Sequence, residues 1–208
     1  MRPRDGAMPG ASSTVAPIAA VQRRDALAAA LLAGPCLAVT ARPADPMLES
    51  AAWRITNDAV MGGVSSSRVD GQGDALRFSG EVRLEFSGGF ASTRRPLAAA
   101  LPADAAGFAL RVRGDGNRYR LRVYTRDAAG RENAWSHYAV FATRAGEVTT
   151  VELRWPQFAA SFRGRAVDAP PPSALEVIGL GVMITKDDHR DGQGPFALDL
   201  LRIEPLPR

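Results

Sequence analysis

The sequence has very few of the side chains on which most metal sites and nucleophilic enzymes depend. Among 208 residues there is one cysteine, Cys36, and there are two histidines, His137 and His189. A single cysteine excludes an intramolecular disulfide and a cysteine-based zinc site. Two histidines provide few ligands for a histidine-based catalytic metal centre. Metal hydrolase chemistry is therefore disfavoured, and we expect neither a bound metal nor a cofactor.

Lysine and net charge are also scarce. Lys186 is the only lysine beside twenty-five arginines, which we interpret as coding bias. The 26 basic and 22 acidic residues give a net charge of +4, but residues 1–44 hold five arginines and two aspartates. That leaves 21 basic and 20 acidic groups, a net of +1, for residues 45–208. Nucleic-acid binding needs basic residues gathered on one face, so we expect no nucleic-acid partner.

The sequence lacks a hydrophobic run long enough to span a membrane. The longest apolar run, 26–41, is short and is interrupted by Gly34-Pro35, so we expect no transmembrane segment. Arg23-Arg24 before this run, and small residues before Asp45, are typical of an export signal of the twin-arginine type. This predicts a periplasmic bacterial protein cleaved near Ala41 or Ala44. The alternative is a start codon placed too far upstream and a cytoplasmic protein.

From Asp45 onward the dominant pattern is alternation of apolar and polar residues, which is typical of half-buried strands. No amphipathic helix is indicated, and the Ala-rich stretch 97–106 follows Pro96 and contains Pro102, so that at most one helical turn is expected. Gly and Pro recur between the runs, which favours an all-β antiparallel sandwich. We therefore predict a leader over 1–44 and a single β-sandwich domain over 45–208. The expected strands are 75–86 (with a bulge at Ser79-Gly80), 135–143, 148–154, 176–184 and 196–203.

The clearest pattern lies in residues 107–127. Alternate apolar residues at 108–112 and again at 119–123 flank the sequence Gly114-Asp115-Gly116-Asn117. Gly and Asn tolerate positive φ, so the two runs predict an antiparallel hairpin. The connection is interpreted as a turn, and the alternative is a charged functional patch of Arg113, Asp115 and Arg118.

A second distinctive stretch is NDAVMGGVSSS, residues 57–67. Asn57 and Asp58 are expected to form an Asx-type turn, and Gly62-Gly63 to bend the chain. Met61 is expected to fill an irregular gap in the core. A phosphate loop would need a Lys at fixed spacing, and a nucleophilic Ser65 would need a nearby base such as His. Neither motif is present.

Two further segments have both a structural and a functional interpretation. The acidic stretch 186–194 is expected to be a solvated turn, with calcium binding as the alternative; it is not an EF-hand, since the twelfth position from Asp187 is Leu198. Trp53, Trp135 and Trp155 are expected to be half-buried strand residues with bonded indole N–H groups, with a sugar-lining groove as the alternative.

The order of these segments is similar to that of the complex I intermediate-associated family, from about Trp53 to Ile203. Three blocks give the resemblance, followed by Phe141 and Thr143, "FRG" at 162–164 and "GPF" at 194–196. The candidate binding cluster consists of these matching residues: Asn57, Asp58, Met61, Gly62, Gly63 and Ser65; Gly88, Gly89, Phe90, Ser92 and Arg94; and Arg113, Asp115 and Tyr119. Gly114 and Gly116 also match the third block.

The resemblance implies a galactose-binding-like jelly roll without established catalytic residues. It also implies a non-enzymatic protein-binding role resembling respiratory complex I assembly factors, with respiratory complex subunits as partners. An exported protein could not reach the cytoplasm-facing arm of complex I, so the family predicts the fold better than the role. The alternative is a carbohydrate- or cell-envelope-binding module. A third hypothesis is an enzyme that uses Asp58, Ser65, Arg94, Arg113 or Asp115.

Overall fold

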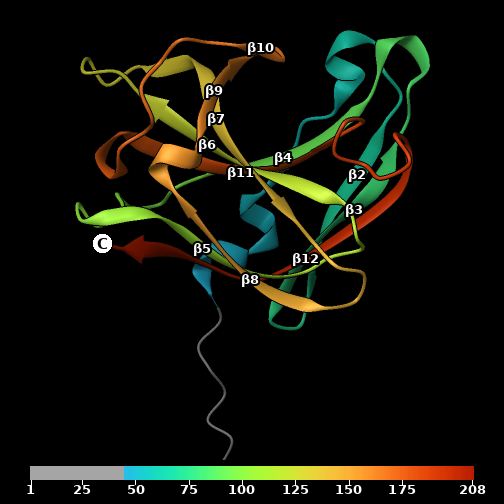
Figure 1. Cartoon of the computed structure of the whole chain (residues 1–208), viewed down its shortest axis with the longest axis horizontal. Coiled ribbons are helices and arrows are strands. Elements are labelled where there is room, and N and C mark those ends of the chain that lie inside the picture. Colours follow the sequence, from blue (N-terminus) through green and yellow to red (C-terminus); the bar gives the residue numbers. More distant parts are fainter. Residues whose placement is uncertain (1–44) are drawn as a thin grey trace, which may run out of the picture. The chain divides into compact units, whose positions relative to one another are not determined.

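The computed structural model describes residues 45–208, and the predicted leader lies outside these residues. The described chain forms two antiparallel sheets (Figure 1). The seven-stranded sheet has the order β1 (Arg54–Ile55), β4 (Phe90–Pro96), β11 (Val177–Thr185), β6 (Arg118–Arg126), β7 (Glu132–Ala142), β9 (Ala159–Phe162) and β10 (Arg165–Ala166). The five-stranded sheet has the order β2 (Ser66–Gln72), β3 (Ala75–Val82), β12 (Gly194–Pro207), β5 (Ala105–Arg113) and β8 (Val148–Arg154).

The helices in residues 45–208 are six short 3₁₀ turns at the ends of strands. They are η1 (Pro46–Leu48), η2 (Ser50–Ala52), η3 (Asp58–Met61), η4 (Glu85–Ser87), η5 (Trp155–Gln157) and η6 (Ala174–Glu176). None of these helices is long and apolar enough to cross a membrane. The stretch 97–104 contains no helix, in agreement with Pro96 before it and Pro102 within it.

The core lies between the two sheets and follows from the alternation in the sequence. In β5 the residues Phe108, Leu110 and Val112 are fully buried, and in β6 the same holds for Tyr119, Leu121 and Val123. These side chains meet those of β3, β11 and β12 from both sheets. The predicted all-β antiparallel sandwich is confirmed. The two sheets pack together because each has one apolar face, and each covers the apolar face of the other.

The predicted hairpin of residues 108–112 and 119–123 is wrong. β5 pairs with β12 and β8 in one sheet, whereas β6 pairs with β11 and β7 in the other. The connection at 114–117 therefore crosses from sheet to sheet, and the hydroxyl of Thr143 holds it by accepting from the N–H of Gly116 and donating to the carbonyl of Asn117. Both strands direct alternate apolar residues inward, so the pattern is the same for a hairpin and for a crossing.

The predicted strand at 75–86 is shorter than expected and has no bulge. It ends at Val82, and Leu84, expected on the inward face, is 42% exposed. The register with β2 and β12 runs without a shift through Ser79 and Gly80. Gly80 is needed there for space, since a Cβ at this position would overlap with the carbonyl of Ser66 on β2. Gly80 is therefore explained by the close approach of the β2 backbone and not by a β-bulge.

Candidate functional site

The first two blocks of the candidate cluster are joined by the carboxylate of Asp58, which is fully buried. Its Oδ1 accepts from the N–H of Ser65 at 3.0 Å, and its Oδ2 accepts from the hydroxyl of Ser65 at 2.5 Å. Oδ2 also accepts from the N–H groups of Gly89 at 2.7 Å and Phe90 at 3.2 Å. Burial by itself raises the pKa of Asp58, but these hydrogen bonds outweigh burial and hold the pKa below its ordinary value.

Asn57 and Ser92 make a second connection between the same two blocks. The side-chain oxygen of Asn57 accepts from the hydroxyl of Ser67 at 2.8 Å and from the N–H of Ser92 at 3.3 Å. The hydroxyl of Ser92 donates to the carbonyl of Thr56. The stretch 57–67 is therefore more than a local turn, because its polar side chains fasten it to residues some thirty positions later in the chain.

The expectation that Met61 fills the core is wrong, since its side chain is 57% exposed. Val60 beside it is 72% exposed, and both lie in η3. The glycines that follow have different roles. Gly62 has a φ of +90°, whereas a Cβ at Gly63 would overlap with the side chain of Asp58. The bend therefore depends on one left-handed residue and one residue without a side chain.

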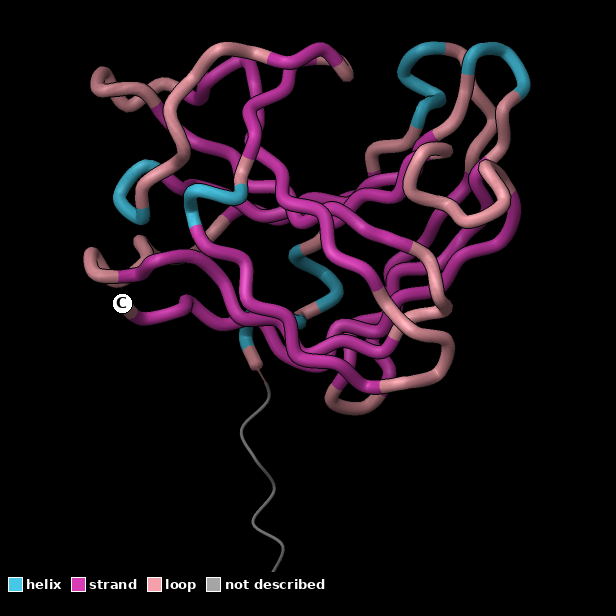
Figure 2. Tube along the Cα trace, in the orientation of Figure 1, coloured by secondary structure: helices cyan, strands magenta, loops and turns pink. Residues whose placement is uncertain are grey.

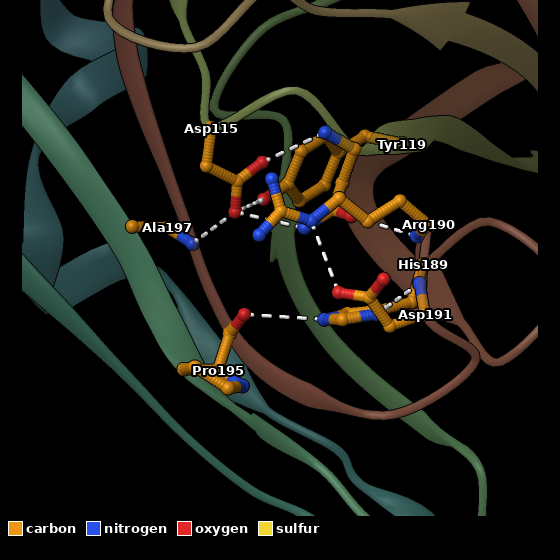
Figure 3. A network of polar contacts seen from close by, with 8 residues as sticks. Asp115, Tyr119, His189, Arg190, Asp191, Pro195 and Ala197 are labelled. Atoms are coloured by element: carbon orange, nitrogen blue, oxygen red, sulfur yellow. Dashed lines mark hydrogen bonds and ion pairs between the residues drawn. The ribbon is translucent and has the colours of Figure 1, made fainter.

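The third block lies in a different network, which Figure 3 shows. Oδ2 of Asp115 accepts from the hydroxyl of Tyr119 at 2.9 Å, from the side-chain amide of Asn117 at 2.9 Å and from the N–H of Ala197 at 2.8 Å. Burial and the nearby Asp115 carboxylate raise the pKa of Tyr119. Arg113 is half-exposed, 4.0 Å from the carboxylate of Asp199. Asp115 therefore joins the crossing connection to β12, in agreement with a structural turn.

The segment 186–194 links the two networks, and the expectation of a solvated turn is wrong for Asp188. This carboxylate is buried and accepts from Arg120 at 2.6 Å and from the hydroxyl of Thr185 at 2.5 Å. The N–H of Lys186 donates to the carbonyl of Gly89 at 2.7 Å, and the N–H of Arg190 donates to Asn117 at 2.9 Å. Within residues 45–208, no three His, Cys, Asp or Glu side chains gather in a way that could hold a metal ion.

The polar residues of the enzyme hypothesis do not form one cluster. The hydroxyl of Ser65 is bonded to the buried Asp58, whereas Arg94 is paired with Glu132 at 2.8 Å. The ring nitrogens of His137 and His189 that form hydrogen bonds do so with backbone groups, those of Pro170, Pro195 and Asp191. Among the described residues, neither histidine is hydrogen-bonded to Ser65.

A groove of about 780 Å³ lies on the outer face of the seven-stranded sheet. Its floor is formed by β4, β11, β6 and β7. One wall is the β9–β10 turn, and the other is formed by the loops that contain η3 and η4. Figure 2 shows both walls rising above the sheet, with η3 and η4 as the two cyan segments at upper right. The exposed Val60 and Met61 lie in this second wall.

The floor of the groove is basic and aromatic. The Arg94 and Arg122 guanidinium carbons lie 3.8 and 5.2 Å from the centroid of the Tyr124 ring, and that of Arg120 lies 4.8 Å from the Tyr138 ring centroid. These are cation–π distances. A Cβ at Gly181 on β11 would lie 2.6 Å from the carbonyl oxygen of Thr93 and 3.2 Å from the Tyr124 ring, so the glycine leaves room for both. The groove lining has five basic side chains and two acidic ones, a net of +3.

The groove contains only part of the candidate cluster. Met61, Gly88, Gly89, Phe90, Ser92 and Arg94 line it. The sequence reasoning missed Arg120, Arg122, Tyr124 and Tyr138. A signal for three of them was present, because in RYRLRVYTR every residue that alternates with Tyr119, Leu121 and Val123 is Arg or Tyr. An outward strand face of this composition is a candidate binding surface.

The three tryptophans differ in their surroundings. The indole N–H of Trp53 donates to the carbonyl of Met47, and that of Trp155 donates to the carbonyl of Ala105. The indole nitrogen of Trp135 is buried without a partner among the described residues. Bonded indoles are confirmed for Trp53 and Trp155, but Trp53 is buried in the core, and neither residue lies in a strand. Trp135 is a strand residue, and the expected bond of its indole is wrong. Trp135 alone lies along the groove.

The fold and the motifs together define a family. The family model for complex I intermediate-associated protein 30 matches residues 43–200. The chain therefore belongs to the complex I intermediate-associated protein 30 family, and the resemblance found in its sequence is confirmed. No curated protein sequence matches the chain.

Solved structures with a similar fold include carbohydrate-binding modules. The family 11 module of the cellulosomal cellulase Lic26A-Cel5E of Clostridium thermocellum matches with a TM-score of 0.53 and 13% identity, over 75% of this chain and 88% of that one. A family 11 module from the same organism, in complex with a β-1,3-1,4-mixed-linked tetrasaccharide, matches with a TM-score of 0.50 and 13% identity, over 76% and 91%. At this identity the likeness shows the fold alone, and the predicted galactose-binding-like jelly roll is confirmed.

Proposed function

We propose that this protein is a non-enzymatic binding domain that engages another protein, in the manner of an assembly factor. The observation that supports this most directly is the groove on the outer face of the seven-stranded sheet, with its basic floor and exposed apolar wall. Membership of the complex I intermediate-associated family supports the same role. A concave surface with aromatic and arginine side chains is typical of binding sites.

The hydrogen bonds of the signature residues support a role without catalysis. Asp58 and Asn57 accept from backbone N–H groups and from serine hydroxyls, and Asp115 accepts from Tyr119, Asn117 and a backbone N–H of β12. A general base or nucleophile has to reach a substrate. These groups are instead used to hold loops, and the loops in turn form the wall of the groove.

The family suggests respiratory complex subunits as partners. The proposed export signal restricts which of these subunits the protein could meet. We propose that the protein is exported to the periplasm by the twin-arginine route, with a cytoplasmic location as the alternative. A periplasmic protein would meet membrane and envelope proteins rather than the cytoplasm-facing arm of complex I. Unchanged assembly and abundance of complex I in cells that lack the protein would contradict the complex I version of the proposal.

A substitution that fills the groove tests the proposal directly. Ala134 is exposed on β7 and lines the groove, so Ala134→Trp places bulk in it without disturbing the core. We expect quantitative co-purification from the native host to lose its specific partner with this variant. Ala109→Trp is the matched control, since Ala109 alternates with buried Phe108 and Leu110 on the other sheet. Equal recovery of the partner with both variants would show that the groove is not the binding surface.

The second candidate function is a carbohydrate- or envelope-binding module. The observation that favours it is the fold that the chain shares with carbohydrate-binding modules. Saturable binding to a glycan array or to isolated peptidoglycan, lost with Ala134→Trp and kept with Ala109→Trp, would establish this function. If the protein bound saturably to neither the glycan array nor peptidoglycan, protein binding would remain as the proposed role of the groove.

A further inference from the structure

One arginine on the groove floor lacks an acidic partner. Arg122 lies half-buried on β6, where its Nε and Nη2 both donate to the hydroxyl of Ser136, at 3.2 and 2.6 Å. Its neighbours on the floor differ, because Arg94 is paired with Glu132 at 2.8 Å and Arg120 with the buried Asp188 at 2.6 Å. No carboxylate within residues 45–208 forms an ion pair with Arg122. A hydroxyl satisfies two of its donors but leaves its charge uncompensated.

The surroundings of Arg122 favour an anion over a neutral ligand. The Tyr124 ring, which would be a platform for a sugar ring, already has the Arg94 guanidinium 3.8 Å from its centroid. The net charge of the groove lining is +3, or +2 when the buried Asp188 that pairs with Arg120 is included, against +1 for residues 45–208 as a whole. The positive charge of the domain is thus concentrated on this face, and a planar guanidinium binds a carboxylate through two parallel hydrogen bonds.

The walls of the groove favour a polypeptide as the bearer of that carboxylate. Val60 and Met61 are 72% and 57% exposed on one side, and Phe162 is 43% exposed on the other. The loop that holds Val60 and Met61 is anchored by the buried Asp58, so these apolar side chains are displayed by a fixed backbone. Apolar side chains held in the open are typical of protein-binding surfaces.

We infer that the groove binds an acidic segment of a partner protein, with a carboxylate paired to Arg122 and apolar side chains against Val60, Met61 and Phe162. The inference rests on the proposed function, since it specifies the occupant of the same groove. An acidic polysaccharide offers the carboxylate without the apolar side chains, and the experiment below separates the two.

A random peptide library displayed on phage, selected on the immobilised full-length protein, tests the inference. We expect the selected peptides to be enriched in Asp and Glu over the starting library. We expect synthetic versions to bind Arg122→Gln about tenfold more weakly or worse, because a charge-assisted pair is lost. Arg111→Gln is the matched control, since Arg111 is exposed on the outer face of the other sheet; its affinity should stay within about twofold of wild type.

The outcomes separate this inference from the proposed function. Peptides that lose binding with Ala134→Trp but are not enriched in acids, or that bind Arg122→Gln at wild-type affinity, would overturn the acidic specificity and keep the groove. Selection of no peptide, or of peptides insensitive to Ala134→Trp, would overturn both. Polygalacturonate that binds saturably and depends on Arg122, with no peptide selected, would overturn the protein segment as occupant. Circular dichroism and thermal melts of each variant confirm that it is folded.

Discussion

At the scale of single residues, Asp58 is the group on which the two most distinctive sequence blocks depend. Its buried carboxylate has a serine hydroxyl and three backbone N–H groups as donors. Without it, those N–H groups would face each other with no acceptor. The loop of η3 and the start of β4 are therefore held together by one negative charge, which is matched by donors rather than by a cation.

Asp58→Asn is expected to lower the free energy of unfolding by about 3 kcal/mol, because an amide presents two donors to a site made of donors. The pKa of Asp58 is lowered in the folded state, so its contribution is complete above the unfolded pKa and is lost as pH falls through the folded one. Urea unfolding at pH 7 and pH 3 measures both effects. The Asn variant should lack this part of the pH dependence, and the exposed Asp104→Asn should behave as wild type.

The two adjacent glycines should respond differently to alanine. Gly62→Ala places a side chain in open space at positive φ, which costs about 1 kcal/mol. Gly63→Ala forces a Cβ against the side chain of Asp58, and we expect a loss of about 2–3 kcal/mol. In a double-mutant cycle, the cost of Gly63→Ala should shrink when Asp58 is already Ala. An unchanged cost in that background would show that the overlap does not determine the effect.

His137 gives stability a second dependence on pH. The ring is buried, its Nε2 donates to the carbonyl of Pro170, and its Nδ1 has no partner among the described residues. Burial lowers the pKa of His137, with the Pro170 bond and Glu176 acting in the opposite direction. As pH falls, His137 is therefore protonated at a higher pH in the unfolded chain than in the folded protein.

Stability should accordingly be lost as pH falls below the unfolded value of about 6.5, by at most about 1.4 kcal/mol per pH unit. Denaturant unfolding between pH 8 and pH 5 measures this slope. His137→Gln should reduce it. If the variant retains the whole slope, another group is responsible for it.

At the scale of elements, the connection of β5 to β6 shows how loops determine the topology. The chain leaves one sheet at Arg113 and enters the other at Arg118. Asp115 in this connection is bonded to Asn117, Tyr119 and the N–H of Ala197 on β12. One carboxylate thus joins the two sheets at this end of the sandwich (Figure 3).

Asp115→Asn is expected to lower the free energy of unfolding by about 2 kcal/mol, since four donors lose a charged acceptor. Tyr119→Phe removes only one of these bonds and should cost about 1 kcal/mol. The exposed Asp191→Asn in the adjacent loop is the control and should be close to neutral. Thermal melts compare the three, and equal melting temperatures for Asp115→Asn and Asp191→Asn would contradict the proposed joining role.

At the scale of the whole molecule, the proposed export has to suit the fold of residues 45–208. Residues 45–208 have a hydrophobic core between the two sheets. The twin-arginine route transports proteins that are already folded, and a self-contained domain of this kind is compatible with it.

The intact mass of the protein purified from its own host tests the proposed export. We expect a mass that corresponds to a chain beginning near residue 42 or 45. That result would direct the search for partners to the envelope. A mass that retains Arg23-Arg24 would contradict processing, and the cytoplasmic assembly-factor role would then be the better account.

Much of the fold could be predicted from local patterns, whereas strand partners could not. Alternation has a period of two in every strand, so residues 108–112 and 119–123 identify their own buried faces. Which strand lies beside them depends on contacts distant in sequence, such as Thr143 with Asn117 and Asp115 with Ala197. The hairpin prediction was wrong for this reason, since a Gly-Asp-Gly-Asn turn suits both a hairpin and a crossing.

The sequence by itself determined the fold class, the family and the inward face of each main strand, because these depend on residue types at short spacing. Only the tertiary structure decided that Met61 is exposed, that Asp58 reaches Gly89, and that Arg94 and Arg122 meet over Tyr124. The physical reason is that a groove is formed by side chains from strands that are neighbours in the sheet but far apart in the chain. Residue types determine the chemistry of such a surface, and the order of strands in the sheet places its side chains next to one another.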